Sequence, residues 1–135
     1  MNIKTTFRAR RGALLASIAL LLAGTQAAAQ DVQRGEKLFT DCRSCHAVQA
    51  GVNNVGPSLA GIVGRKAASA EDFRYSPAMK RSGITWDSAT LAAFIADPQA
   101  VVPGNRMPYA GMPDAKDIAD LIAYLAKAGG GAAPR

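Results

Sequence analysis

The apolar positions of this chain recur with a helical period in short segments, which long loops rich in glycine and proline separate. The clearest segment runs from Asp114 to about Ala128, and Gly129 ends it. Its apolar side chains fall on one stripe, formed by Ile118, Leu121, Ile122 and Leu125. The spacing therefore predicts an amphipathic helix with one face against a core.

Capping residues predict two helices earlier in the chain. Asp31 is a suitable N-cap for a helix that runs to about Arg43 and buries Val32, Leu38 and Phe39. Ser76-Pro77 opens a short second helix, because proline fits the first turn, and Gly83 lies past its end.

A further helix is predicted to follow Asp87 as its N-cap. Leu91, Phe94 and Ile95 share one face of it, and Asp97-Pro98 stops it. No segment shows a clear alternation of β-branched residues, which a strand would need. The sequence therefore predicts an all-α fold of about four to five short helices joined by long loops.

Residues 1–29 are predicted to be a cleaved secretory signal. A basic start leads into an apolar run from Ala13 to Ala23 and then into small residues; the basic side chains are Lys4, Arg8, Arg10 and Arg11. As a helix, a run of about a dozen residues reaches only about 18 Å, short of a bilayer core of about 30 Å. We expect export to the bacterial periplasm, no stable membrane insertion after cleavage, and one domain over residues 30–135 with a short flexible tail from about 129.

Removing the signal changes the interpretation of the charge. The whole chain carries a formal +6, but four basic and no acidic residues lie in its first thirty positions. The remainder has twelve basic and ten acidic side chains, a net charge of +2. Nucleic acid is therefore not an expected partner.

One pentapeptide carries the clearest chemistry. Cys42-Arg43-Ser44-Cys45-His46 has the C-x-x-C-H spacing of a c-type haem attachment site, in which two thiols add to the haem vinyl groups and the histidine binds the iron. A zinc site of four cysteine and histidine ligands is excluded, because the chain has two cysteines and one histidine. A thioredoxin-like dithiol is disfavoured, because the strands it needs are missing from the pattern.

A second axial ligand is sought among the methionines. Met107 lies in a loop bracketed by Pro103 and Pro108, which can hold its thioether towards the iron. Met112 is the weaker alternative, one short loop later, and Met79 falls in the predicted short helix, where methionine more often packs a core.

On these motifs the mature chain resembles a class I c-type cytochrome, and is similar to mitochondrial cytochrome c and the small bacterial cytochromes c. The likeness covers nearly all of residues 31–128. Its matching stretches are Gly35-x-x-x-Phe39, Cys42 to His46, Gly56-Pro57-x-Leu59, Gly64-Arg65-Lys66, Tyr75-Ser76, Gly83-Ile84-Thr85-Trp86, Pro103-Gly104-x-x-Met107 and Asp120 to Leu125. The resemblance implies the cytochrome c fold, with the first and last helices crossing around one covalent haem.

The resemblance also implies roles for single residues. The carbonyl of Pro57 is expected to accept a hydrogen bond from the second ring nitrogen of His46. Tyr75 and Trp86 are expected to hydrogen-bond a buried haem propionate, with Arg65 as its charge partner. The methionine ligand of the family follows Pro-Gly at the spacing of Met107.

Departures from the mitochondrial pattern bear on the haem environment. Phe94 stands where those relatives have a tyrosine whose hydroxyl reaches the ligand sulphur, so we expect a modestly lower reduction potential. Met79 replaces a polar residue, and Asn105 replaces the threonine two positions before the ligand.

A haem iron with histidine and methionine ligands has no free site for a substrate. The sequence therefore predicts a non-enzymatic periplasmic one-electron carrier, a monomer that docks transiently with redox proteins: a quinol-oxidising complex or dehydrogenase as donor, and an oxidase or reductase as acceptor. The alternatives are a haem protein with a labile methionine that binds peroxide or a gas, and a dedicated electron-accepting subunit of one dehydrogenase. The expected docking rim comprises Arg43, Val55, Arg106 and Tyr109.

Overall fold

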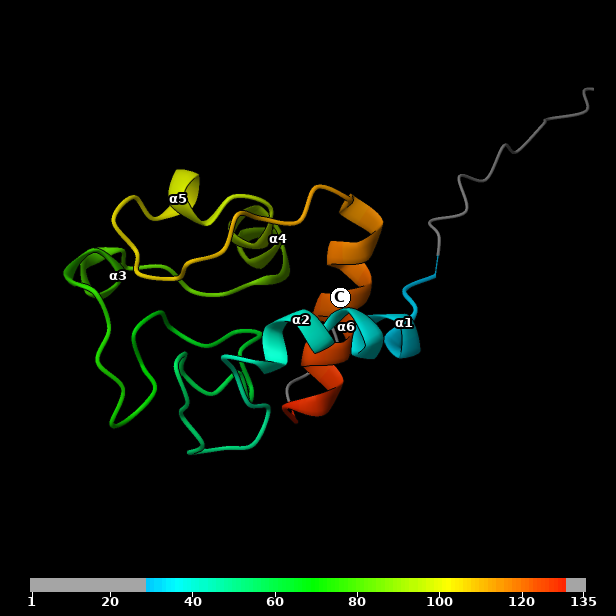
Figure 1. Ribbon diagram of the computed structural model, residues 1–135, viewed down its shortest axis with the longest axis horizontal. Helices are drawn as coiled ribbons and strands as arrows, with labels where there is room; N and C mark the ends of the chain where they lie inside the picture. The colour runs from blue at the N-terminus through cyan, green and yellow to red at the C-terminus, as the bar shows by residue number, and fades with distance from the viewer. Residues whose placement is uncertain (1–28, 131–135) are drawn as a thin grey trace, which may run out of the picture.

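The computed structural model describes residues 29–130, so all but the last residue of the predicted signal and the end of the tail lie outside the described residues. Within this range the chain is helical, and its one β-type pairing is an isolated bridge between Lys66 and Thr85. The helices are α1 (Val32–Leu38), α2 (Thr40–Arg43), α3 (Pro77–Arg81), α4 (Ser88–Ala96), α5 (Pro98–Val101) and α6 (Ala115–Ala128) (Figure 1). The predicted all-α class is confirmed.

The two predicted N-caps, Asp31 and Asp87, are present, and Ser76 and Asp114, predicted as the starts of two further helices, are N-caps as well. In each case a short polar side chain accepts a hydrogen bond from a backbone N–H two or three residues into the helix. These pairs are Asp31 with Arg34, Ser76 with Met79, Asp87 with Thr90, and Asp114 with Asp117. Residues with the right side chain immediately before an apolar run thus fix where the helices begin.

The first helix departs from the prediction. It was expected to be continuous to about Arg43, but it is divided at Phe39 into α1 and α2. The ring of Phe39 is 2% exposed and packs against Tyr124, with ring centroids 5.4 Å apart. Leu38 and Val32, which were expected to be buried, are only partly so. The buried contact at Phe39 therefore lies at the point where the helix is interrupted.

Helix α5 was not predicted. Asp97-Pro98 ends α4 as expected, but the same pair also starts the next turn, because the Asp97 carboxylate accepts a hydrogen bond from Ala100 N at 3.0 Å. Proline at the first helical position requires no N–H donor. Asp97 and Pro98 therefore both end α4 and begin α5.

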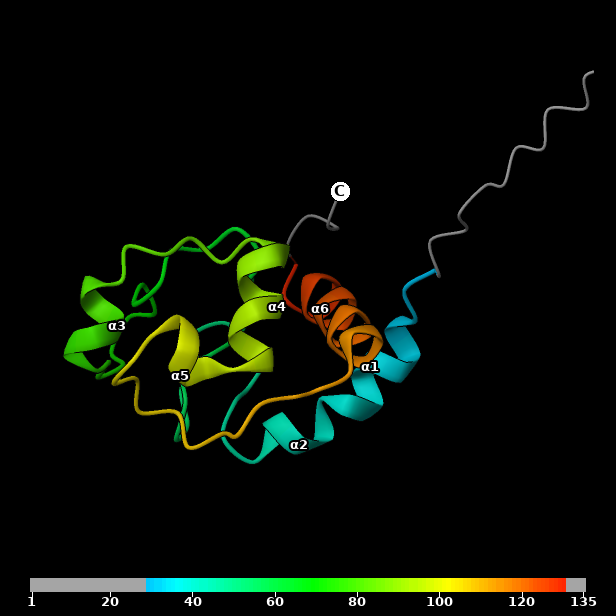
Figure 2. The same ribbon diagram turned by 90° about the horizontal axis from the view of Figure 1, so that it is seen from above.

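Helices α1 and α6 cross, as the resemblance implied (Figures 1 and 2). Gly35 lies at the crossing, and a side chain there would overlap with the backbone carbonyl of Asp120. Asp120 itself is buried and accepts hydrogen bonds from Asp31 N and Lys116 Nζ, each at 2.8 Å. Gly35 therefore allows the backbones of α1 and α6 to approach closely, and the Asp120 carboxylate joins the two segments through its hydrogen bond from Asp31 N.

The remaining helices extend away from the crossing of α1 and α6. In Figure 2, α3 and α5 lie at the end of the molecule away from α1 and α6, and α4 runs between them. The buried side chains of α4 and α6 form most of the apolar core, which includes Leu91, Phe94, Ile95, Ile118, Leu121, Ile122 and Leu125. The long loops 44–76 and 102–114 connect these two sides.

Candidate haem site

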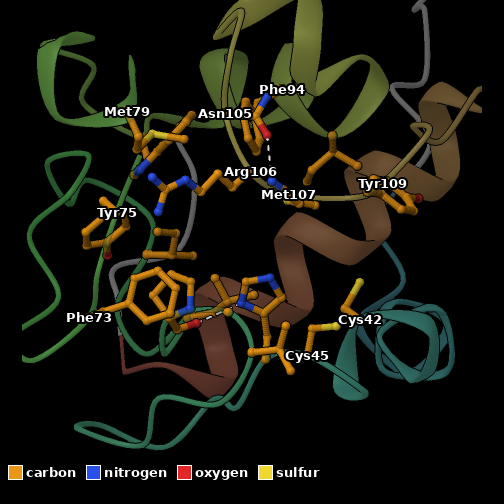
Figure 3. Close-up of a pocket in the computed structure, with 18 of the residues that line it drawn as sticks. Cys42, Cys45, Phe73, Tyr75, Met79, Phe94, Asn105, Arg106, Met107 and Tyr109 are labelled. Atoms are coloured by element: carbon orange, nitrogen blue, oxygen red, sulfur yellow. Dashed lines mark hydrogen bonds between the residues drawn. The ribbon is translucent and has the colours of Figure 1, made fainter. Parts of the chain in front are cut away.

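A cavity of about 370 Å³ opens between the helices and the long loops. Its walls are mostly apolar and include side chains from α2, α3, α4 and α6 (Figure 3). All eight predicted site residues line it: Cys42, Cys45, His46, Pro57, Arg65, Tyr75, Trp86 and Met107. One cavity therefore gathers residues that span more than sixty positions of sequence.

The two cysteines are placed by the end of α2. The backbone turns there, since the amides of Cys45 and His46 both donate to the carbonyl of Cys42, at 3.1 and 2.9 Å. Cys42 and Cys45 form no disulfide, both are partly buried, and their side chains lie near each other at one side of the cavity (Figure 3). Burial raises the pKa of the Cys42 thiol, and the nearby Asp41 carboxylate and Cys45 add to that rise.

His46 is fixed through its first ring nitrogen. Its Nδ1 lies 2.7 Å from the carbonyl oxygen of Pro57, so Nδ1–H donates and Nε2 keeps its lone pair. Burial lowers the pKa of the imidazole, an effect that the hydrogen bond to Pro57 partly offsets. Gly56 makes room for the ring, because a Cβ at that position would overlap with it. The neutral imidazole is the form that ligates a metal.

Arg65 forms the polar part of the wall. Its two terminal nitrogens donate to the carbonyls of Ala60 and Ser58, each at 2.7 Å. Its Nε is buried without a hydrogen-bond partner. Burial lowers the pKa of this guanidinium, although the nearby Tyr75 partly offsets the change. A buried N–H that lacks an acceptor, in a side chain on the cavity wall, suits an added carboxylate.

Tyr75 and Trp86 also lie on the wall. The Tyr75 hydroxyl accepts a hydrogen bond from Ala70 N at 3.2 Å, which leaves its own O–H able to donate. Trp86 is 6% exposed, and its ring packs against Phe94 with centroids 4.9 Å apart. Phe94 thus contributes a ring without a hydroxyl to the same wall.

Of the three candidate methionines, Met79 and Met107 line the cavity and Met112 does not. Met107 lines the cavity, whereas Met112 is 8% exposed within the apolar core and does not belong to the cavity wall. Met79 in α3 also lines the cavity, on the side of Tyr75 (Figure 3). The site therefore offers two thioethers, of which only Met107 lies on a loop.

These residues fit a c-type haem. The two cysteines lie on one side of the cavity and Tyr75 with Phe73 on the other (Figure 3). A haem carries its two propionates on the edge away from its vinyl groups, so Tyr75 lies on the side that the propionates need. Arg65, whose Nε–H is unpaired, is close enough to Tyr75 to interact with it and can serve the same edge. Arg74 and Arg106 line the cavity as well, while Asp41 beside Cys42 is the one acidic residue among the described lining residues.

Sequence reasoning missed several lining residues. Phe73 packs edge-on against Tyr75 with centroids 4.8 Å apart, and neither it nor Arg74 carried a motif. Gly56 was quoted only as part of a stretch, although its lack of a side chain is what admits the His46 ring. Its position directly before Pro57 was the available signal.

Comparisons with known proteins identify the family. The family model described as cytochrome c matches residues 32–129. Cytochrome c2 iso-2 of Magnetospirillum fulvum is 51% identical over 87 residues, which are 64% of this chain and 91% of the relative. Cytochrome c-554 of Methylosinus trichosporium is 46% identical over 118 residues, 86% of this chain and 89% of the relative. The solved structure of cytochrome cH from Methylobacterium extorquens aligns with a TM-score of 0.68 at 45% identity, over 72% of this chain and 98% of that one.

The fold and the site define a c-type cytochrome. The chain belongs to the cytochrome c family, which confirms the resemblance found in its motifs. Membership of this family brings one covalently attached c-type haem and the role of an electron carrier.

Proposed function

We propose that this cytochrome is a periplasmic one-electron carrier whose haem is joined to Cys42 and Cys45 and ligated by His46 and Met107. The supporting observation is that all four side chains line one cavity together with Arg65, whose buried Nε–H lacks a partner. When bound, the haem iron supplies the chemistry by cycling between its ferrous and ferric states.

The protein residues tune that cycle rather than take part in it. The carbonyl of Pro57 orients the His46 ring and increases its basicity. Trp86 and Phe94 exclude water from the wall, and a dry setting favours the ferrous state. Among residues 29–130 no side chain donates a hydrogen bond to the Met107 sulphur. The thioether therefore remains a stronger donor than in relatives that have a tyrosine hydroxyl there.

Electron exchange is expected at the cavity edge near the cysteines. Val55 lines the cavity and is 73% exposed. Arg106 is exposed and lines the cavity as well, and the exposed Arg43 directly follows Cys42 in the sequence. Tyr109 is partly buried and completes this rim. A small mixed patch of this kind suits brief docking with a respiratory donor and an oxidase or reductase.

Export completes the proposal. Residues 1–29 serve as a cleaved secretory signal, residues 30–135 are the carrier domain, and the mature chain works as a periplasmic monomer. Within the described residues no helix has the length and apolar character needed to cross a bilayer. A dedicated electron-accepting subunit of one dehydrogenase would use the same site, so the proposal covers the chemistry of both.

A gas- or peroxide-binding haem protein is disfavoured. Such a protein needs an acid–base group near an open iron, and His46 is the single histidine of the chain. It also needs a sixth ligand that leaves readily, whereas Met107 lies in a loop held by several hydrogen bonds.

Two measurements test the proposal. Potentiometric titration of the haem-loaded protein should follow a one-electron curve with a positive midpoint potential. Carbon monoxide added to the ferrous protein should leave the spectrum unchanged, because the sixth position is filled. Ready carbon monoxide binding, or turnover with peroxide, would contradict the carrier function and support the ligand-binding alternative.

A further inference from the structure

Asn105 lies in the loop between α5 and Met107, and it is 8% exposed. Its side-chain Nδ2 donates to the carbonyls of Pro98 and Val102, at 2.8 and 2.9 Å. Its Oδ1 accepts from the backbone N–H of Met107 at 2.9 Å. A single side chain therefore ties the beginning and the end of α5 to the residue that carries the thioether.

These hydrogen bonds use both N–H donors of the amide and its carbonyl oxygen. A primary amide offers two N–H donors and one carbonyl acceptor, and Asn105 places all three on backbone groups of its own loop. While these bonds persist, the side chain has no donor left for the Met107 sulphur or for a haem carboxylate. Asn105 lines the cavity, but its side chain hydrogen-bonds only to backbone groups of its own loop.

A second side chain closes the same loop from outside. Gln99 Nε2 donates to the carbonyl of Asn105 at 3.2 Å, and its Oε1 accepts from Gly104 N at 3.1 Å. Gly104 has a φ of +82°, which suits glycine, and it lets the chain reverse between these two contacts. The segment 97–107 thus carries its own internal hydrogen-bond network, and Asn105 is its buried member.

We propose that Asn105 is a positioning residue that holds Met107 in place and sets how often the sixth coordination position opens. This inference rests on the proposed assignment of Met107 as the axial ligand. Removing the amide leaves the N–H of Met107 without its partner, whereas the carbonyls of Pro98 and Val102 each lose one donor and keep the backbone donors Val102 N and Asn105 N. The open form of the loop, in which water can reach the Met107 N–H, then becomes more populated.

Imidazole is a suitable probe of that open form, because it binds ferric iron only when the methionine has left. Its apparent affinity scales with the populated fraction of the open state. Absorption titration of the ferric, haem-loaded Asn105→Ala variant should show imidazole binding about tenfold tighter or more than in the parent protein. Gln99→Ala, which removes one partly buried and one exposed hydrogen bond and leaves the Met107 N–H paired with Asn105, should show a smaller increase.

A stability-matched control separates positioning from general weakening. Asp87 caps α4 by accepting a hydrogen bond from Thr90 N at 2.7 Å, and it does not line the cavity. Asp87→Ala should lower the unfolding temperature through loss of the cap but leave imidazole affinity within about twofold of the parent.

The outcomes distinguish the two proposals. If the parent ferric protein lacks the far-red band of a methionine–iron bond, the ligand assignment fails and the proposed function with it. If the band is present but Asn105→Ala binds imidazole no more tightly than Asp87→Ala does, the positioning role of Asn105 is wrong and the carrier function stands.

A measurement on the parent protein covers the case in which Asn105→Ala does not mature. The amide proton of Met107 donates to Asn105, so in the haem-loaded protein it should exchange with solvent at least about tenfold more slowly than that of the exposed neighbour Arg106. Equal exchange at the two positions would overturn the inference.

Discussion

The imidazole ring of His46 lies directly over Gly56, so closely that a methyl group at position 56 would overlap with three of the ring atoms. The adjacent residue, Pro57, fixes the orientation of the ring, because its carbonyl oxygen lies 2.7 Å from His46 Nδ1 and accepts a hydrogen bond from it. Two consecutive residues thus set both the position and the orientation of the proposed proximal ligand.

Gly56→Ala should displace the His46 ring and weaken its bond to Pro57. Overpacking of this kind costs about 1–3 kcal/mol of folding stability, and here it also moves the proposed ligand. We expect a lower yield of haem-loaded protein from exporting cells and a lower unfolding temperature. Gly51→Ala controls for the loss of a loop glycine, because a Cβ at Gly51 meets nothing within 4 Å and the cost is limited to the backbone strain of its φ of +73°. Equal yields from the two variants would show that the close approach at Gly56 is unimportant.

Arg65→Ala should change stability and reduction potential together. The variant leaves the carbonyls of Ser58 and Ala60 without their donor, which costs about 1–3 kcal/mol. It also removes a positive charge from the cavity wall, which should make the midpoint potential more negative. The neighbouring Lys66 is exposed, so Lys66→Ala should change both quantities much less. An unchanged potential in Arg65→Ala would argue against a propionate beside this side chain.

Phe94→Tyr should move the potential in the opposite direction. The Phe94 ring lines the cavity and is 8% exposed, so the added hydroxyl enters the space beside the proposed ligand. Donation of that hydroxyl to the Met107 sulphur would weaken the thioether as a donor and raise the midpoint potential. Phe73→Tyr, on the other side of the cavity, serves as the control for adding a hydroxyl (Figure 3). A potential that falls in Phe94→Tyr would contradict the assigned geometry.

Acid should destabilise the protein partly through Asp120. The hydrogen bond from Asp31 N, followed by that from Lys116, holds the pKa of this carboxyl below its ordinary value of 3.8. A carboxyl whose folded pKa is depressed adds stability above its unfolded pKa, and this stability is lost as the pH falls through the folded value. Asp120→Asn should therefore lower the unfolding temperature at pH 7 and flatten its decline below about pH 4.

The control for Asp120 is Glu36→Gln, an exposed carboxyl on α1. This variant should keep the acid dependence of the parent protein. A parallel decline in the Asp120→Asn variant and the parent would show that the buried carboxylate does not link folding to pH.

Local signals in the sequence were sufficient for most of the fold. N-caps such as Asp87 and Asp114 satisfy backbone donors within their own turn, so the residue type alone indicates the start of the helix. The division at Phe39 was not predictable in this way. It coincides with the contact between Phe39 and Tyr124, which are brought together only when α1 crosses α6.

The same distinction applies to the site. The haem motif and the loop of Met107 are each a continuous stretch of sequence and could be recognised from it, and the structure places both on the wall of one cavity. The network of Asn105 needs the carbonyls of Pro98 and Val102 on a turn that was itself missed, so its hydrogen bonds could not be deduced from the sequence. Likewise, Met79 shares the cavity because loop 66–76 returns α3 to it, and no local pattern encodes that return.

The central claim is that Met107 and His46 together ligate the haem iron, and the ferric absorption spectrum tests it most directly. The haem-loaded parent protein should show the weak far-red band that a methionine sulphur on ferric iron produces. That band should disappear in Met107→Ala and persist in Met79→Ala and Met112→Leu. A high-spin spectrum without the band in the parent, or a band that survives in Met107→Ala, would contradict the account.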